Sequence, residues 1–141
     1  MTSSATTGSP DSIDQFEATG LSDLLASIEE GLPTTMVDEV EERLDLTSQE
    51  MSAFLGTSTR TLERRRDDGM LTPAESERLY RIVRLFHTAT KVFGTEKEAR
   101  RWLKRPQMRL GEQVPLEIAR LDPGAREVER LLGRIEHGIP A

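Results

Sequence analysis

An arginine-rich segment near the middle of the chain holds the residue types best suited to binding phosphate. Four arginines lie among the seven residues from Arg60 to Arg66, and the chain contains no cysteine. Arginine pairs with phosphate and with guanine through a planar fork of N–H donors. The segment therefore predicts a nucleic-acid contact rather than a thiol-based catalytic or metal site.

The residues before and within this segment follow the order of a helix-turn-helix. Thr47–Glu50 is a capping box that starts a first helix, Gly56 permits a left-handed turn, and Ser58 suits the N-cap of a second helix. We expect the second helix to enter the major groove, with its outward polar side chains reaching bases or phosphates. The predicted DNA-binding residues are Ser58, Thr59, Arg60, Thr61, Arg64, Arg65 and Arg66.

Two positions depart from the usual motif, and a simpler interpretation stays open. Thr57 stands where such motifs usually place an apolar residue, and Arg65 stands where an aromatic or aliphatic side chain often closes the core. A capped helical corner with a solvated arginine face would contain the same residues. We favour DNA binding because the spacing, the glycine, the caps and the outward polar residues agree.

A single helix-turn-helix reads only a few base pairs, so we expect a homodimer on a two-fold operator. The sequence does not identify the dimer face. Two helices are candidates, and both also suit the core. One carries Tyr80, and the other carries Leu21, Leu24, Leu25 and Ile28.

The last twenty residues, Asp122 to Ala141, carry a second group of charged side chains. Asp122 suits the N-cap of a helix, and Gly138 stands just past its expected end. The charged face opposite the apolar face suits a protein partner, although an ordinary solvated helix fits the same residues. The apolar face is formed by Val128, Leu131, Leu132 and Ile135.

The elements around these two segments are predicted to be helical. Helical periodicity dominates from Ile13 onward, and strand signals are nearly missing. The prediction is an all-α bundle of about seven or eight helices, with a long connecting helix over residues 73–93. Local expectations are a helix start at Pro33, a turn at Asp67–Gly69, a second capping box at Thr95–Glu98 and a loop over 107–114.

Charge is distributed unevenly along the chain. Residues 1–46 carry a net charge of −10, residues 47–110 carry +6 and residues 111–141 carry −2, within a total of −6. The basic middle supports a local DNA contact, whereas the acidic first third predicts weak nonspecific binding.

The sequence offers no sign of a membrane or export signal. No run approaches the ~20 apolar residues of a membrane span. The first ten residues lack the basic and apolar regions of a signal peptide, and we expect a disordered lead over residues 1–12. The missing cysteines fit a reducing compartment, so we expect a cytoplasmic protein with no membrane contact.

From about Leu21 to Ala141 the chain resembles the Xre/MbcA/ParS-type antitoxins, which are partners of RES-domain toxins. The resemblance rests on six blocks in order, and the first twenty residues lie outside it. The blocks are Gly31–Pro33, Thr59–Arg65, Leu71–Leu79, Ala99–Leu103 with Pro106, Leu110–Gly111 with Pro115–Leu116, and Gly124–Gly138.

The resemblance implies an antitoxin that dimerises, binds its own operator and docks the toxin with its C-terminal domain. RES toxins are similar to ADP-ribosyltransferases and consume NAD, so neutralisation implies that the toxin's NAD site is covered. The implied domains are an Xre-like helix-turn-helix domain over 13–72 and a toxin-binding domain over 73–141. The implied toxin-binding residues are Arg126, Glu129, Arg130, Arg134, Glu136, His137, Gly138, Ile139, Pro140 and Ala141.

Two other functions stay open. The first is a solitary transcription regulator whose C-terminal domain binds another protein or a ligand. The second is an enzyme, which the sequence disfavours because no constellation of catalytic residues is found. His87 and His137 are far apart and lack metal-ligand spacing, so no metal site and no cofactor is predicted.

Overall fold

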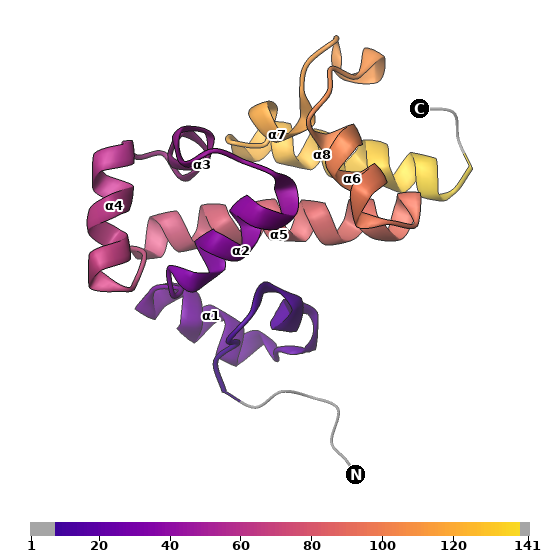
Figure 1. Cartoon of the computed structure of the whole chain (residues 1–141). Helices are drawn as coiled ribbons and strands as arrows, with labels where there is room; N and C mark the ends of the chain where they lie inside the picture. Colours follow the sequence, from indigo (N-terminus) through magenta and orange to yellow (C-terminus); the bar gives the residue numbers. More distant parts are fainter. Residues whose placement is uncertain (1–7, 139–141) are drawn as a thin grey trace. The chain divides into compact units, whose positions relative to one another are not determined.

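The computed structural model describes residues 8–138, which fold into helices joined by short turns (Figure 1). In these residues extended backbone pairs only at two isolated β-bridges. The all-α class predicted from the sequence is therefore confirmed. The α-helices are α1 (Leu21–Glu30), α2 (Thr35–Leu44), α3 (Ser48–Leu55), α4 (Thr59–Asp68), α5 (Pro73–Phe93), α6 (Glu96–Leu103), α7 (Pro115–Ile118) and α8 (Asp122–Glu136), and the 3-10 helices are η1 (Ile13–Ala18) and η2 (Met108–Leu110).

The chain divides into two compact units, residues 1–79 and residues 80–141, and the boundary falls inside α5. Residues 1–7 of the predicted disordered lead lie outside the described residues. Residues 8–12 are described, and there Pro10 is buried and the amide of Gly8 donates to Asp23 at 3.0 Å. No helix within residues 8–138 is both long and apolar enough to cross a lipid bilayer.

The turn between α1 and α2 pairs with the turn between α4 and α5, and this pairing closes the first unit. The amide of Leu71 donates to the carbonyl oxygen of Leu32 at 2.9 Å. The amide of Leu32 donates to the buried hydroxyl of Ser76 at 2.7 Å. Gly31 permits the close approach, because a Cβ there would lie 2.2 Å from the carbonyl oxygen of Leu71 and its φ is +108°.

The buried carboxylate of Glu75 ties the start of α5 to α4. Glu75 is 6% exposed, and its Oε1 accepts hydrogen bonds from the amide of Thr72 at 3.0 Å and from Nε of Arg65 at 2.9 Å. The Thr72 hydroxyl accepts from the amide of Glu75, which completes a capping box for α5. Burial alone raises the pKa of Glu75, but the bonds from Arg65 and Thr72 outweigh burial and hold the pKa below its ordinary value.

Two helix boundaries in the first unit differ from the sequence predictions. Pro33 does not start α2: it forms a β-bridge with Met70, and α2 begins at Thr35. The predicted turn at Asp67–Gly69 was wrong for its first two residues, which form the end of α4. Gly69 then ends the helix in the left-handed conformation, with φ +86°.

The apolar stripe predicted on α1 is mostly exposed. Leu24 is buried, whereas Leu21 and Leu25 are 70% and 52% exposed and Ile28 is half-buried. Exposed apolar side chains on one helix mark a contact surface when they cluster. Leu21 and Leu25 of α1 are therefore available to a partner, whereas Leu24 belongs to the core.

In the second unit, α8 packs its first turn directly on α7. A Cβ at Gly124 would lie 1.9 Å from the carbonyl oxygen of Ile118, so only glycine fits there without a shift. Asp122 is the first residue of α8 rather than its N-cap, which is Leu121. The predicted apolar face of α8 is buried at Val128, Leu131 and Leu132, and is half-buried at Ile135.

The connection from α6 to α8 contains more helix than the sequence suggested. The predicted loop over 107–114 includes η2, whose N-terminal neighbour Gln107 pairs with Gln113. Arg81 in α5 donates to the carbonyl oxygen of Arg120 at 3.0 Å, beyond the end of α7. This bond satisfies a carbonyl group that the short helix leaves without an internal partner.

We predict that Glu75→Ala lowers the free energy of unfolding by about 2–4 kcal/mol, because it leaves Arg65 unpaired and removes the cap of α5. Urea denaturation at neutral pH measures the loss. Glu30→Ala, which removes an exposed carboxylate from α1, serves as the matched control and should change stability by less than about 0.5 kcal/mol.

The same variant tests the charge of Glu75. The pKa of Glu75 is lower in the folded than in the unfolded chain. Its ionised carboxylate therefore contributes its full stabilisation of the fold at pH values above its ordinary pKa of about 4.5. The contribution is lost as pH falls through the lower folded-state pKa. The gap in stability between the wild type and Glu75→Ala should therefore narrow on acidification, and a gap independent of pH would contradict the ion pair.

Candidate functional site

The helix-turn-helix predicted from the sequence is formed by α3, a three-residue turn and α4. Thr47 and Glu50 make the predicted capping box: the Thr47 hydroxyl accepts from the amide of Glu50 at 3.0 Å, and the Glu50 carboxylate accepts from the amide of Thr47 at 2.9 Å. Ser58 caps α4, because its hydroxyl accepts from the amide of Thr61 at 3.0 Å. Both caps fix the chain direction at the helix starts.

Gly56 ends α3 in the left-handed conformation, with φ +74°. A guanidinium group lies directly beside it, because a Cβ at Gly56 would be 2.6 Å from Nη1 of Arg78. Arg78 donates to the carbonyl oxygen of Leu55 at 3.1 Å, at the end of α3. The turn therefore depends on glycine both for its conformation and for the space that Arg78 occupies.

The exposed face of α4 carries the polar side chains available to a ligand. Thr59, Arg60 and Arg64 are exposed, and Leu62 is fully buried on the opposite side. Arg60 and Arg64 form no ion pair with any residue in the range 8–138. Thr61 is half-buried, and its hydroxyl accepts from the Ser58 hydroxyl at 3.0 Å.

The other two arginines predicted to bind DNA are held by carboxylates of the same unit. Arg65 pairs with Glu75, and this hydrogen bond is the main cause that raises the pKa of Arg65 above its ordinary value. Arg66 pairs with Glu41 through Nη2 at 2.8 Å and with Asp38 through Nε at 3.2 Å. Burial lowers the pKa of Arg66, but these carboxylates outweigh burial and raise it.

The ion pair with Glu75 explains how an arginine fits at position 65, where the usual motif has an apolar side chain. The position that commonly holds an apolar side chain closes the unit through an ion pair with Glu75 instead. Arg66 joins α4 to α2 in a similar way. These contacts make both residues structural supports of α4, and they leave Arg60 and Arg64 as its exposed basic groups.

The second candidate surface, the charged face of α8, is largely neutralised by ion pairs. Arg126 pairs with Asp122 at 2.8 Å, Arg130 pairs with Glu127 at 2.6 Å, and Glu129 pairs with Arg84 at 2.7 Å. The remaining predicted contacts within the described residues, Arg134, Glu136, His137 and Gly138, are exposed at its end. Ile139, Pro140 and Ala141 lie outside the described residues.

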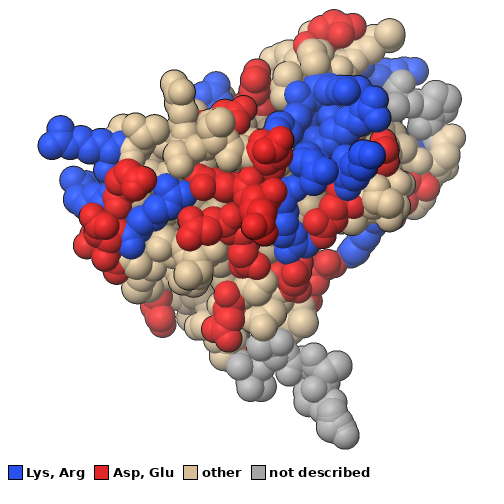
Figure 2. Space-filling view, in the orientation of Figure 1, with Lys and Arg blue, Asp and Glu red and all other residues tan. Residues whose placement is uncertain are grey.

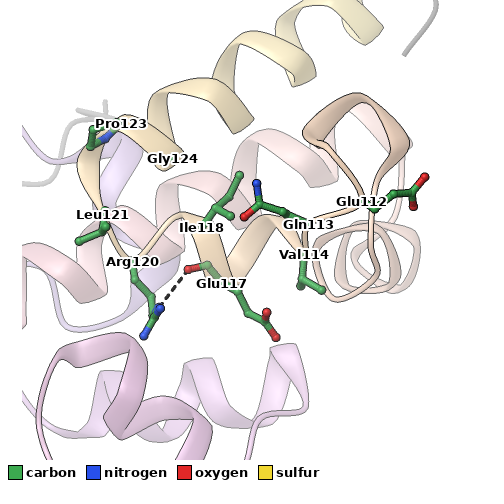
Figure 3. Close-up of a pocket in the computed structure, with 9 residues that line it drawn as sticks. All are labelled: Glu112, Gln113, Val114, Glu117, Ile118, Arg120, Leu121, Pro123 and Gly124. Atoms are coloured by element: carbon green, nitrogen blue, oxygen red, sulfur yellow. Dashed lines mark hydrogen bonds between the residues drawn. The ribbon is translucent and has the colours of Figure 1, made fainter.

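A pocket of about 540 Å³ lies beside the start of α8. Figure 3 shows Gln113, Val114 and Ile118 lining it from α7 and the preceding loop, with Pro123 and Gly124 at the start of α8. Nε of Arg120 donates to the carbonyl oxygen of Glu117 at 3.0 Å on the same wall. Leu121, which is 70% exposed, completes an apolar rim that a partner side chain can cover.

Sequence reasoning missed a third surface, the basic face of α6. Figure 2 shows Lys and Arg side chains gathered over this helix. A signal was present, because cations recur at intervals of three and four residues and Ala99 and Leu103 are buried on the other side. The cations are Lys97, Arg100, Arg101, Lys104 and Arg105.

The described residues do not bring together the groups of a metal site. Within residues 8–138 no three His, Asp or Glu side chains are arranged to hold a metal ion. His87 is half-buried in α5, and its ring lies 6.1 Å from that of Phe86. His137 is exposed at the C-cap of α8.

Two protein-family models match this chain in succession. Residues 23–84 match the antitoxin Xre-like helix-turn-helix domain, and residues 88–138 match the antitoxin Xre/MbcA/ParS C-terminal toxin-binding domain. The first match contains α3 and α4, and the second contains α6, α7 and α8.

Curated relatives are similar over most of the chain. Antitoxin Xre of Yersinia enterocolitica and antitoxin Xre of Photorhabdus laumondii are each 36% identical over 118 residues, covering 82% of this chain and 80% of the relative. Antitoxin Xre of Pseudomonas putida is 33% identical over 112 residues, covering 79% of this chain and 69% of the relative.

Proposed function

The chain belongs to the Xre antitoxins, and we propose that it neutralises a cognate RES-domain toxin and represses its own operon as a DNA-bound homodimer. The observation that carries the proposal is the succession of a helix-turn-helix domain and a toxin-binding domain in one chain. A regulatory protein of this kind needs two binding surfaces and no catalytic centre, in keeping with the antitoxin relatives.

The DNA interface is formed by the start and outer face of α4. Ser58, Thr59, Arg60, Thr61 and Arg64 are the proposed contacts, with Arg60 and Arg64 donating to guanine or phosphate. The first turn of α4 adds backbone amides suited to phosphate. Arg65 and Arg66 act by holding α4 in place, since their guanidinium groups are paired with Glu75, Glu41 and Asp38.

The toxin interface is formed by the exposed side of α8 and the residues after it. Covering the NAD site of the toxin would prevent NAD consumption without any chemistry by the antitoxin. The proposed contacts are Arg126, Glu129, Arg130, Arg134, Glu136, His137 and Gly138, followed by Ile139–Ala141. Arg134 and His137, at the end of α8, are both exposed.

The dimer face is proposed on α1. Leu21 and Leu25 are among the most exposed large apolar residues of the described chain, at 70% and 52%. Pairing two copies through α1 would bury these side chains and present two copies of α4 to a two-fold operator.

The alternative function is a solitary transcription regulator whose C-terminal domain binds another protein. Neutralisation of the toxin by this chain distinguishes an antitoxin from such a regulator.

We predict that Arg60→Ala combined with Arg64→Ala abolishes binding to the promoter DNA upstream of the chain's own gene. Each lost contact weakens binding by about 1–3 kcal/mol, or roughly fivefold to 140-fold per arginine. Fluorescence anisotropy with labelled duplex measures the loss, and Arg109→Ala, an exposed arginine in η2, is the control. Toxin neutralisation should survive, and loss of both activities in a folded variant would contradict two separate interfaces.

We predict that growth arrest caused by the product of the neighbouring gene is relieved by the full-length chain and not by a chain cut before Asp122. Cell growth and cellular NAD are the measurements. Deleting Ile139–Ala141 alone should weaken the relief, while the Arg60→Ala, Arg64→Ala variant serves as a control that still neutralises. A harmless neighbour, or one unaffected by this chain, would favour the solitary regulator.

We predict that Leu21→Glu combined with Leu25→Glu converts the dimer to a monomer, because two charges cannot be buried against an apolar surface without a partner. Sedimentation velocity measures the change. Met108→Glu, at a residue of the second unit that is 79% exposed, is the control for adding charge at an exposed apolar position. An unchanged sedimentation coefficient in the double variant would exclude α1 as the dimer face.

A further inference from the structure

The α6 basic face, defined as Lys97, Arg100, Arg101, Lys104 and Arg105, is the largest run of cations at helical spacing in the second unit. Lys97, Arg101 and Arg105 are exposed, and none of the three forms an ion pair with a residue in the range 8–138. The opposite side of α6 is anchored by Ala99 and Leu103, both fully buried. Lys97 and Arg101 are therefore carried on a packed helix, and Arg105 follows two residues after its end.

A pocket of about 320 Å³ opens beside this face. Its apolar part is formed by Phe93, Trp102 and Pro106, and the two aromatic rings lie 5.4 Å apart between centroids, at an angle of 40°. The guanidinium-bearing side chains of Arg101 and Arg105 line the same pocket. One carboxylate, that of Glu98, also lines it, so cationic groups outnumber anionic ones.

The pocket wall is held by hydrogen bonds of the chain itself. The side-chain amide of Gln107 donates to the carbonyl oxygens of Trp102 at 2.9 Å and Arg105 at 3.2 Å. The indole N–H of Trp102 donates to no acceptor within residues 8–138. Arg101, Arg105 and the indole group are thus donors without an acceptor in the described chain, and carboxylates are the acceptors that suit them.

We infer that the Phe93–Trp102 pocket and the α6 basic face dock an acidic segment of the toxin that carries an apolar or aromatic side chain. The inference rests on the proposed function, because it takes the toxin as the partner. The pocket would receive the apolar side chain, and Arg101 and Arg105 would pair with carboxylates around it. Aromatic and arginine side chains around a small pocket are the usual energetic centre of a protein interface.

Two observations favour a protein partner over the phosphate backbone of DNA. Phosphate contacts need exposed cations and no apolar pocket, whereas here an aromatic pair lies among the cations. The whole surface also falls inside residues 88–138, and this range matches a toxin-binding domain. Arg126, Glu129 and Arg130 of α8 are paired with other side chains, whereas Lys97, Arg101 and Arg105 have no ion-pair partner within residues 8–138.

The test is the affinity of the full-length chain for the purified product of the neighbouring gene, measured by calorimetry at low and high salt. Arg101→Glu combined with Arg105→Glu should raise Kd at least about tenfold at low salt, and the difference should shrink at high salt. Lys91→Glu combined with Arg109→Glu makes the same charge change outside the pocket and should leave Kd within about twofold. Circular dichroism and thermal unfolding establish that each variant is folded.

Trp102 provides a second readout because it is the single tryptophan of the chain. Labelling the antitoxin with 5-fluorotryptophan gives one ¹⁹F resonance, and adding unlabelled toxin should shift or broaden it. In the Arg101→Glu, Arg105→Glu variant, the same change of the resonance should require a toxin concentration that is higher in proportion to the raised Kd.

The outcomes separate the inference from the proposed function. Wild-type binding with an unchanged Kd in the Arg101→Glu, Arg105→Glu variant and an unmoved ¹⁹F resonance would overturn the inference and leave the antitoxin function intact. A variant that binds toxin normally but binds duplex DNA more weakly would assign the α6 basic face to nucleic acid instead. No binding by the wild-type chain would overturn both.

Discussion

The position of α4 depends on the buried carboxylate of Glu75. This group caps the start of α5 through Thr72 and neutralises Arg65 of α4. Breaking a buried ion pair leaves an uncompensated charge, so neither partner can be replaced alone without a large loss of stability. The turn pairing at Gly31 and Leu71 brings the same two segments together through the backbone. Together these contacts fix the direction in which Arg60 and Arg64 leave the surface.

The charge of the first unit limits how the protein can bind DNA. Residues 1–79 contain six Lys or Arg and seventeen Asp or Glu residues, a net charge of −11. Arg65 and Arg66 are neutralised within this unit, so few positive groups remain to replace counterions on DNA. Such an interface gains little from nonspecific attraction and depends weakly on salt. In the proposed dimer, two copies of α4 would then supply affinity through specific contacts.

Much of the fold could be predicted because its signals are local. The capping box at Thr47, the left-handed Gly56 and the Ser58 cap involve residues within a few positions of one another, and all three are present. The buried face of α8 followed from helical spacing in the same way. The predicted start at Pro33 was wrong because a distant residue, Met70, pairs with it. Local propensity cannot anticipate a partner that lies more than thirty positions away.

The sequence by itself determined the helical class, the place of the helix-turn-helix and the supply of arginines in α4. Only the tertiary structure decided which arginines are structural, because Glu75 and Asp38 lie ten and twenty-eight residues from their partners in sequence. The α6 basic face was readable from its spacing, whereas the pocket beside it was not. That pocket exists because Phe93 of α5 meets Trp102 of α6 beside the turn at Pro106, and a concave surface made by two helices has no periodicity that a single segment can reveal.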